Sequence, residues 1–349
     1  MDASTPGNGR PLHERAIGAF SREGEEAVDT VTVTVDLAGG QVGGAARYRT
    51  ELSGYLERHA RHDVKVIGTR RRLGPAWLAA REAKAVRRSR RVALNNVGFF
   101  APGGERWTLL ANALHFLVGQ EADALDPGLR AAMARQAKIV HRAARQSDVL
   151  IAPCTAMAER IAATLPGVAD RLVVRMHPIS GRTLPRPRKD APILCPVLFA
   201  PYKQMDERIA EWLTAIDDVL DESVRLIVTA SATEVPAALA ASPRLRFVGH
   251  LSIAQTRNLW IRSRAVYFPT GLESFGCPLA EARANGRPVI ARDTAQNREI
   301  AGAALCGYTL GDLDSLRHAT EVAMTAQFNP DPAPFDPDAY FDWMLGEGR

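Results

Sequence analysis

The feature that most constrains the fold is an alternation of short β-rich runs with helical patterns, which occurs twice. The first series extends from a strand-like run at Val31–Val35 to another at Arg171–Arg175. The second extends from the run Ile193–Phe199 to a helical pattern at Leu313–Ala326. A segment rich in proline and arginine, without periodicity, separates them at Ser180–Pro192. Such alternation is typical of βαβ units around a parallel sheet, so the sequence predicts two α/β domains.

The chain length of 349 residues also fits two domains. We expect a mobile N-terminal extension at 1–28, since it lacks an apolar signal core, and an N-terminal domain at 29–179. The linker is expected at 180–192 and the C-terminal domain at 193–327. The remaining residues, 328–349, are expected to form a tail with one short helix.

Composition excludes several classes of protein. No run of about 18 apolar residues is present, so no transmembrane helix is expected. The four cysteines lack CxxC spacing, which argues against a zinc site or a disulfide framework and favours a cytoplasmic location. The net charge of +5 is compatible with an acidic ligand or surface without identifying one. Nucleic-acid binding is not expected, because no aromatic platform or groove-reading motif accompanies the basic residues.

The most informative motif follows an apolar run at Ala265–Phe268. A loop carries Glu273, the first acidic residue of the motif, and a helix then begins at Gly276-Cys277-Pro278. The second acidic residue, Glu281, lies in that helix, eight residues after Glu273. Proline at the start of a helix and glycine just before it favour a helix N-terminus with exposed backbone N–H groups, which binds anions. Parallel sheets bind ligands at the carboxyl ends of their strands. The motif therefore predicts a site for a phosphorylated ligand that is rich in hydroxyl groups.

This stretch resembles the donor-site signature of retaining glycosyltransferases of family 4, which have the GT-B fold. The resemblance is carried by Glu273-SFGCPLA-Glu281 and by Gly286-Arg-Pro-Val-Ile-Ala291. The glycine-rich segment Gly39–Gly44 and the run Phe247–Leu251 are also similar to that family. The resemblance implies two Rossmann-like domains that face each other across a cleft. The N-terminal domain would bind the acceptor and the C-terminal domain the nucleotide sugar, and transfer would retain the anomeric configuration.

The resemblance also implies roles for individual residues. Glu281 would bind the ribose hydroxyls, and Glu273 would face the transferred sugar as a catalytic residue. Lys203 would neutralise phosphate charge, although the arginine that the family usually has about five residues earlier is absent. The other expected donor-binding positions are Ser274, Phe275, Gly276, Cys277, Leu279, His250 and Leu251. Backbone N–H groups around Gly276, Cys277 and Leu279 would hold the diphosphate.

Candidate residues in the N-terminal half are fewer. Gly43 and Gly44 either form a flexible turn or approach the phosphate or the acceptor closely. They are not part of a G-x-G-x-x-G fingerprint, because Gln41 occupies a required glycine position. By the resemblance, Asn112 or His115 faces the cleft, with His115 as a second catalytic candidate. The alternative for His115 is a hydrogen-bonded histidine in the core.

No cofactor and no metal are expected, because a helix N-terminus and a lysine can stabilise the charge that develops on a leaving diphosphate. Asp312 and Asp314 form a DxD, but at the start of a helical pattern they are better explained as capping residues. The expected partners are a nucleotide-sugar donor and a glycan, lipid-linked or small-molecule acceptor. The alternatives are a sugar-nucleotide epimerase or phosphorylase of the same fold, and a silent partner that only binds nucleotide or glycan.

A basic face suggests one further partner. In a helix over Pro75–Arg90 and beyond, the residues Arg81, Lys84, Arg88 and Arg91 would fall within an arc of about 80°. Such a face could dock on an anionic membrane or an acidic acceptor, which would make the protein peripheral at the membrane. The alternative is an ordinary solvated cationic face.

Overall fold

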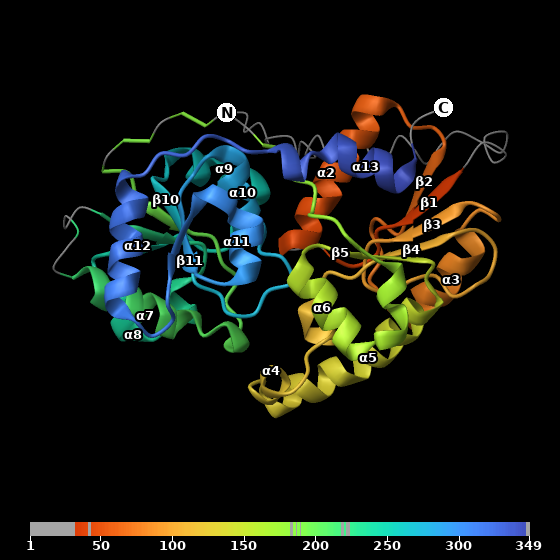
Figure 1. Ribbon diagram of the computed structural model, residues 1–349, viewed down its shortest axis with the longest axis horizontal. Helices are drawn as coiled ribbons and strands as arrows, with labels where there is room; N and C mark the ends of the chain where they lie inside the picture. The colour runs from red at the N-terminus through yellow and green to blue at the C-terminus, as the bar shows by residue number, and fades with distance from the viewer. Residues whose placement is uncertain are drawn as a thin grey trace, which may run out of the picture.

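The computed structural model of the protein describes residues 32–40, 43–181, 184–185, 187–188, 190–217, 220 and 224–346. The described chain forms two α/β halves that lie side by side, each built on a six-stranded parallel sheet (Figure 1). The predicted fold class is thereby confirmed. The expected extension at 1–28 lies outside the described residues, as do Gln41, Val42 and parts of the predicted linker.

The N-terminal sheet has the strand order β2-β1-β3-β4-β5-β6, with every neighbouring pair parallel. Its strands are β1 (Val33–Asp36), β2 (Val64–Ile67), β3 (Arg90–Ala93), β4 (Arg106–Leu109), β5 (Val149–Ala152) and β6 (Leu172–Val174). The helices between them are α2 (Gly43–His59), α3 (Pro75–Lys84), α4 (Gln120–Asp123), α5 (Pro127–Gln146) and α6 (Thr155–Thr164). Strand β1 lies next to the edge strand β2 in the sheet, and α2 begins after the carboxyl end of β1. The segment Gly39–Gly44 between β1 and α2 therefore lies at the carboxyl ends of the strands, where parallel sheets bind ligands.

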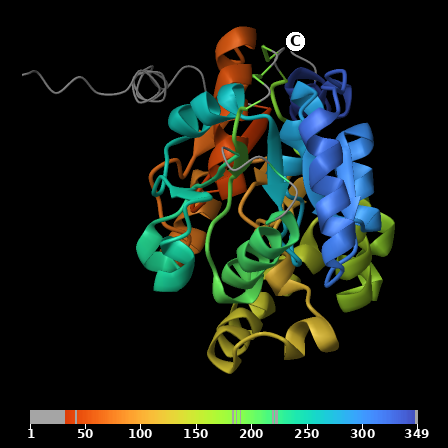
Figure 2. The same cartoon turned by 90° about the vertical axis from the view of Figure 1, so that its left-hand side faces the viewer.

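The C-terminal sheet has the order β12-β11-β10-β7-β8-β9 and is also parallel throughout. Its strands are β7 (Ile193–Cys195), β8 (Leu226–Val228), β9 (Leu245–Phe247), β10 (Ala265–Phe268), β11 (Val289–Arg292) and β12 (Leu305–Tyr308). The helices are α7 (Met205–Ile216), α8 (Ala237–Ala240), α9 (Ile253–Arg262), α10 (Cys277–Asn285), α11 (Ala295–Ala301) and α12 (Leu313–Thr325). Seen from the side of this half, helices lie on both faces of the sheet (Figure 2).

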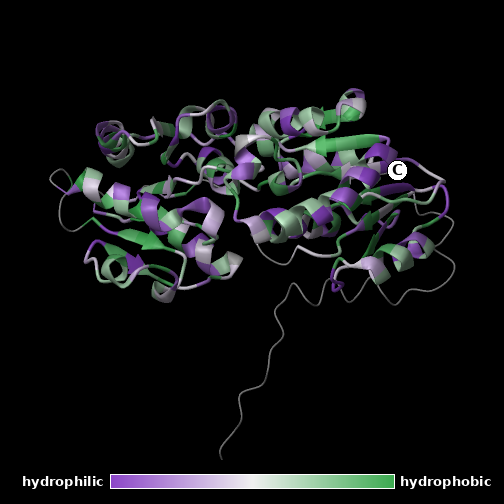
Figure 3. Ribbon diagram, turned by 90° about the horizontal axis from the view of Figure 1, so that it is seen from below, coloured by the Kyte–Doolittle hydropathy of each residue, from purple (hydrophilic) through white to green (hydrophobic). Residues whose placement is uncertain are grey.

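The central strands are hydrophobic on both faces because helices cover both faces. In β10 all four residues are buried, and Val289, Ile290 and Ala291 of β11 are completely inaccessible. Figure 3 shows the same pattern, with apolar strands inside and helices of mixed polarity outside. Continuous apolar strands of this kind are typical of parallel sheets. The run Ala265–Phe268, expected as a buried strand, is confirmed.

Most differences from the expected elements are at their ends, where the chain turns after three or four strand residues. One difference changes an interpretation. Helix α3 ends at Lys84, Ala85 has an extended conformation, and Arg88 has a φ of +70°. Arg88 and Arg91 therefore do not continue the helical face that the sequence suggested, since Arg91 lies in β3.

The predicted basic face is wrong, because two of its four residues are buried. Arg81 is completely inaccessible; its Nη1 donates to Asp36 Oδ2 at 2.8 Å and its guanidinium stacks on Phe99. Arg91 is 4% exposed and donates to the carbonyl of Ala101. A buried carboxylate at the end of β1 needs a cationic partner, and Arg81 supplies it. The face therefore cannot dock on a membrane as proposed. In the part of the chain that the structure describes, no helix is long and apolar enough to cross a membrane.

The C-terminal tail returns to the N-terminal half. Helix α13 (Pro337–Leu345) lies against α2 (Figure 1). Tyr340 and Phe341 are buried against Tyr48, with ring centroids 5.7 Å away in both cases. The expected short helix is confirmed, but its aromatic face belongs to the core of the other domain. This return crossing joins the two halves at a second place besides the linker.

Candidate active site

The Glu-x7-Glu motif lies where β10 ends and α10 begins, as the sequence predicts. Gly276, just before the helix, has a φ of +85°, which favours glycine. Its N–H and that of Cys277 donate to no acceptor among the described residues. Pro278 has no N–H. Two free backbone donors at a helix N-terminus form a favourable place for an anion.

The N-terminus of α2 faces this helix start from the other domain. A Cβ added to Gly44 would lie 3.2 Å from Cys277 Sγ, and one added to Gly43 would lie 3.5 Å from Leu198. Gly43 also has a φ of +62°. The N-termini of α2 and α10, one from each domain, thus lie close together, and the glycines at the start of α2 make room for this contact. Gly43 and Gly44 thus allow α2 to approach Leu198 and Cys277 closely, while their approach to a phosphate or an acceptor stays a prediction.

Glu273 and Lys203 lie together at the cleft. Lys203 Nζ is 2.6 Å from Glu273 Oε1, and both side chains are mostly covered, at 13% and 21% exposure. Lys203 ends the short 3₁₀ helix Pro201–Lys203 that follows the carboxyl end of β7. The structure therefore brings together two residues that lie 70 positions apart in the sequence and that the family resemblance selected.

Glu281 has a cationic partner that the sequence analysis did not identify as a site residue. Arg47 Nη2 of α2 is 3.3 Å from Glu281 Oε1. Burial raises the pKa of Glu281, the positive charge of Arg47 lowers it, and Glu51 raises it. The run Ala45–Tyr48 after the glycines resembles the N-terminal domains of the family, but that resemblance gives Arg47 no role, and an arginine four residues before a glutamate is a common helical pair. Only the packing of the two domains brings it to the motif.

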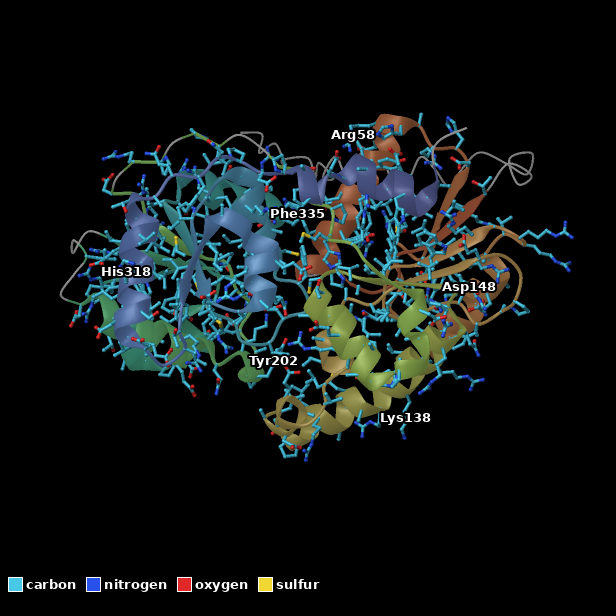
Figure 4. All side chains as sticks on the ribbon, in the orientation of Figure 1. Arg58, Lys138, Asp148, Tyr202, His318 and Phe335 are labelled. Carbon is cyan, nitrogen blue, oxygen red and sulfur yellow. The ribbon has the colours of Figure 1, made fainter. Side chains whose placement is uncertain are left out.

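A small polar cleft of about 50 Å³ lies between the domains beside Glu273. Its walls are Asn112, Ala113, Leu114, Tyr202, Leu272, Glu273 and Ser274. Tyr202 lies on the side of the C-terminal half that faces the N-terminal half (Figure 4). Asn112 therefore stands opposite Glu273, while its Oδ1 accepts from Leu114 N at 3.1 Å.

His115 lies behind Asn112 and does not line this cleft. It is 8% exposed, and its Nε2 is 3.4 Å from both Gln136 Oε1 and Asn112 Nδ2. Burial lowers its pKa, which favours the neutral ring. These surroundings fit the alternative of a hydrogen-bonded core histidine better than a catalytic role.

The other predicted donor-binding residues have different surroundings. Phe275 and Leu279 are buried, with Phe275 edge-on to His177 at 4.7 Å. The N–H of Leu279 donates to the carbonyl of Gly276 at 2.9 Å. His250 is exposed and pairs with Glu234 at 3.0 Å, and Leu251 beside it is half-buried. Their roles toward a donor stay predictions.

The domains also contact each other around the motif. The thiol of Cys154, just before α6, donates to the carbonyl of Ser274 at 3.3 Å. The carboxylate of Glu299 accepts from the N–H of Thr155 at 3.1 Å and from its hydroxyl at 2.9 Å, so it caps α6 from α11. Gln296 Nε2 donates to the carbonyl of Glu273 at 3.2 Å. These bonds fix the loop that carries Glu273 and Ser274.

Cys277 is a packing residue in this site. Burial is the main reason that its pKa is raised to about 12, and the charge of Glu281 raises it further while Arg47 lowers it. A thiol with that pKa is a poor nucleophile at neutral pH. No group of three or more potential metal ligands occurs among the described residues. Asp312 caps α12 by accepting from Ser315 N at 2.9 Å, as expected for a capping residue.

A larger hollow, of about 350 Å³, lies on the N-terminal half and contains none of the predicted site residues. It is lined by Arg145, Thr164, Leu165, Pro166, Gly167, Val168 and Arg171. The guanidinium of Arg171 is occupied there by the carbonyls of Arg145, Ser147 and Gly167. Its cation thus ties together the ends of α5 and α6, and no catalytic constellation surrounds it.

The comparisons with known proteins agree with this geometry. Residues 197–324 match the family model of the glycosyl transferases group 1. The structure of WaaG, a glycosyltransferase involved in lipopolysaccharide biosynthesis, is 13% identical to this chain and superposes with a TM-score of 0.60. The match covers 90% of this chain and 96% of the WaaG chain. AviGT4, a glycosyltransferase involved in avilamycin A biosynthesis, is 13% identical with a TM-score of 0.59 and covers 91% and 97%.

A mutant of S. aureus TarM, in complex with Fondaparinux, alpha-GlcNAc-glycerol and UDP, is 11% identical with a TM-score of 0.53. It covers 74% of this chain, which spans only 53% of the TarM structure. The comparison with curated protein sequences gives no match. The described part of the chain thus has the GT-B fold, and residues 197–324 match the glycosyl transferases group 1 model.

Proposed function

We propose that this protein transfers a sugar from a nucleoside-diphosphate sugar to an acceptor hydroxyl, with retention of anomeric configuration. The observation that carries the proposal is the start of α10. Its free N–H groups at Gly276 and Cys277 lie between Glu273 and Glu281 and face the N-terminus of α2. The family match over residues 197–324 and the UDP held by TarM support the same kind of donor.

Each group has a defined task in this reaction. Breaking the glycosyl–phosphate bond develops negative charge on the diphosphate and positive charge on the anomeric carbon. The N-terminus of α10 and Lys203 would stabilise the first, and the carboxylate of Glu273 the second. Glu281 would accept hydrogen bonds from the ribose. The acceptor hydroxyl would attack from the face that the diphosphate leaves, and a donor phosphate oxygen would take its proton.

Two substitutions test these roles. Glu281→Ala should weaken nucleotide binding by about ten- to a hundredfold, because charge-assisted hydrogen bonds to the ribose are lost. Glu273→Ala should mainly lower kcat, since that carboxylate faces the reacting sugar. Binding is measured by calorimetry with nucleoside diphosphates, after a thermal-shift screen of nucleotide sugars identifies the donor. Parental transfer rates in both variants would refute the site.

The product separates this function from its alternatives. A retained anomer on an acceptor hydroxyl supports the proposal, whereas an inverted product or phosphate as acceptor indicates an epimerase or a phosphorylase. One observation favours a silent partner: no arginine precedes Lys203 in the segment 196–202, and Lys203 is already paired with Glu273. Nucleotide binding without turnover of any donor would identify that role.

A further inference from the structure

Each glutamate of the motif holds one cation, and the two cations come from different domains. Lys203 of the C-terminal domain is 2.6 Å from Glu273. Arg47 of the N-terminal domain is 3.3 Å from Glu281. The proposed function needs both glutamates free to accept from hydroxyl groups. It also needs positive charge at the diphosphate. In the structure each of these cations is paired with a glutamate.

Arg47 is held less tightly than Lys203. Its ion pairs with Glu281 and Glu51 both measure 3.3 Å. Its guanidinium donates no hydrogen bond to any described residue, and its Nε is buried without a hydrogen-bond partner. An arginine has five N–H donors and matches phosphate in a bidentate manner. A cation with unused donors in a polar site is therefore available for an oxyanion.

The position of Arg47 fits the diphosphate. It lies three residues after Gly44 and so shares a face of α2 with it. That face meets the start of α10, since a Cβ on Gly44 would lie 3.2 Å from Cys277 Sγ. Arg47 therefore lies on the face of α2 that meets the start of α10, and its guanidinium reaches the carboxylate that would bind the ribose. The diphosphate of a donor must lie near both the start of α10 and that carboxylate, because it joins the ribose to the transferred sugar.

We propose that Arg47 is a donor-binding residue that the acceptor domain supplies, and that it contacts the diphosphate in place of the arginine absent before Lys203. This inference rests on the proposed function. When the donor binds, the diphosphate takes over the two cations, and the glutamates become free for the hydroxyls of ribose and sugar. Donor binding thereby requires both domains, since one domain supplies Lys203 and the other Arg47.

A purely structural role is the competing explanation. Glu51 accepts from the N–H and the hydroxyl of Ser180, at 3.1 and 2.5 Å, so a chain of contacts connects the end of the N-terminal domain to Arg47 and Glu281. In that case Arg47 would only orient Glu281. Its loss would then weaken the binding of the ribose as much as that of the diphosphate, because only the glutamate would be misplaced.

The test compares ligands that differ only in their phosphates. Calorimetry measures UDP, GDP and ADP, and saturation-transfer NMR titrations measure the matching nucleosides. Arg47→Gln should weaken the diphosphate that the parent protein binds by about ten- to a hundredfold, as expected for loss of charge-assisted hydrogen bonds. Nucleoside binding should change less than about twofold. Arg47→Lys should restore part of the loss.

The matched control is Arg58→Gln on the same helix. Arg58 is half-exposed and pairs with Asp338 of α13, away from the motif (Figure 4). It should leave both affinities unchanged. An equal loss for nucleoside and diphosphate in folded Arg47→Gln, judged by an unchanged thermal transition, overturns the proposal in favour of the structural role. An unchanged diphosphate affinity overturns it as well. If the parent protein binds none of the three diphosphates, the proposed function fails and this inference fails with it.

Discussion

Removal of the Arg81 side chain should destabilise the N-terminal domain strongly. Arg81 and Asp36 are both completely inaccessible and are 2.8 Å apart. Asp36 also accepts from Trp77, from Asn95 and from the N–H of Ala38. In Arg81→Ala the carboxylate stays buried with neutral donors but no counterion. Breaking a buried pair in this way costs about 3–5 kcal/mol.

The size of the effect distinguishes the buried pair from a surface cation. For a domain of this size, about 3–5 kcal/mol corresponds to a fall in Tm of roughly 6–20 °C. Lys84→Ala, on the same helix, is the matched control and should change stability by less than about 0.5 kcal/mol, because its side chain is exposed. Scanning calorimetry measures both. An Arg81→Ala variant with the parental transition would refute the stabilising role of the buried ion pair.

Two further predictions concern the meeting of the two helices. Gly44→Ala should weaken nucleotide binding about three- to tenfold, because the new Cβ would press on Cys277 Sγ at 3.2 Å. The control Gly54→Ala, on the same helix, should leave nucleotide binding unchanged and raise stability slightly. Equal nucleotide affinities in the two variants would contradict the importance of the contact between Gly44 and Cys277. Nucleotide binding should decrease at mildly acidic pH, because burial raises the pKa of Glu281 and ribose binding needs its ionised form. Since Arg47 opposes that rise, Arg47→Gln should shift the decrease to higher pH in a calorimetric titration; a shift to lower pH would refute this account.

Much of the C-terminal half could be predicted from the sequence because its signals are local. The glycine with φ of +85° before α10, the proline after it, and the apolar strands on either side follow from neighbouring residues. The spacing of Glu273 and Glu281 belongs to the same stretch. Lys203 was selected only by its match to a basic position of the family that the chain resembles. The structure places it 2.6 Å from Glu273.

The N-terminal half was predicted less well because its part of the candidate site depends on contacts between distant segments. Asn112 lines the cleft, whereas His115, three residues later, is enclosed by Gln136 and the ring of His141. Both are polar residues in one short segment, and no periodic pattern in the sequence indicates which of the two faces the cleft. Arg81 was misread for a related reason: a helical wheel gives the angle of a side chain but not which neighbouring element covers it.

The sequence by itself determined that this chain forms two α/β halves with parallel sheets and that a helix preceded by glycine begins between two glutamates. Those properties depend on backbone preferences and on apolar patterns over a few residues. Only the tertiary structure decided the charges around that helix. Arg47 and Glu281 are 234 positions apart in the sequence but 3.3 Å apart in space, because α2 and α10 begin at the same place between the domains. Coulomb energy depends on distance in space, so a sequence lists the charges but the packing selects the pairs.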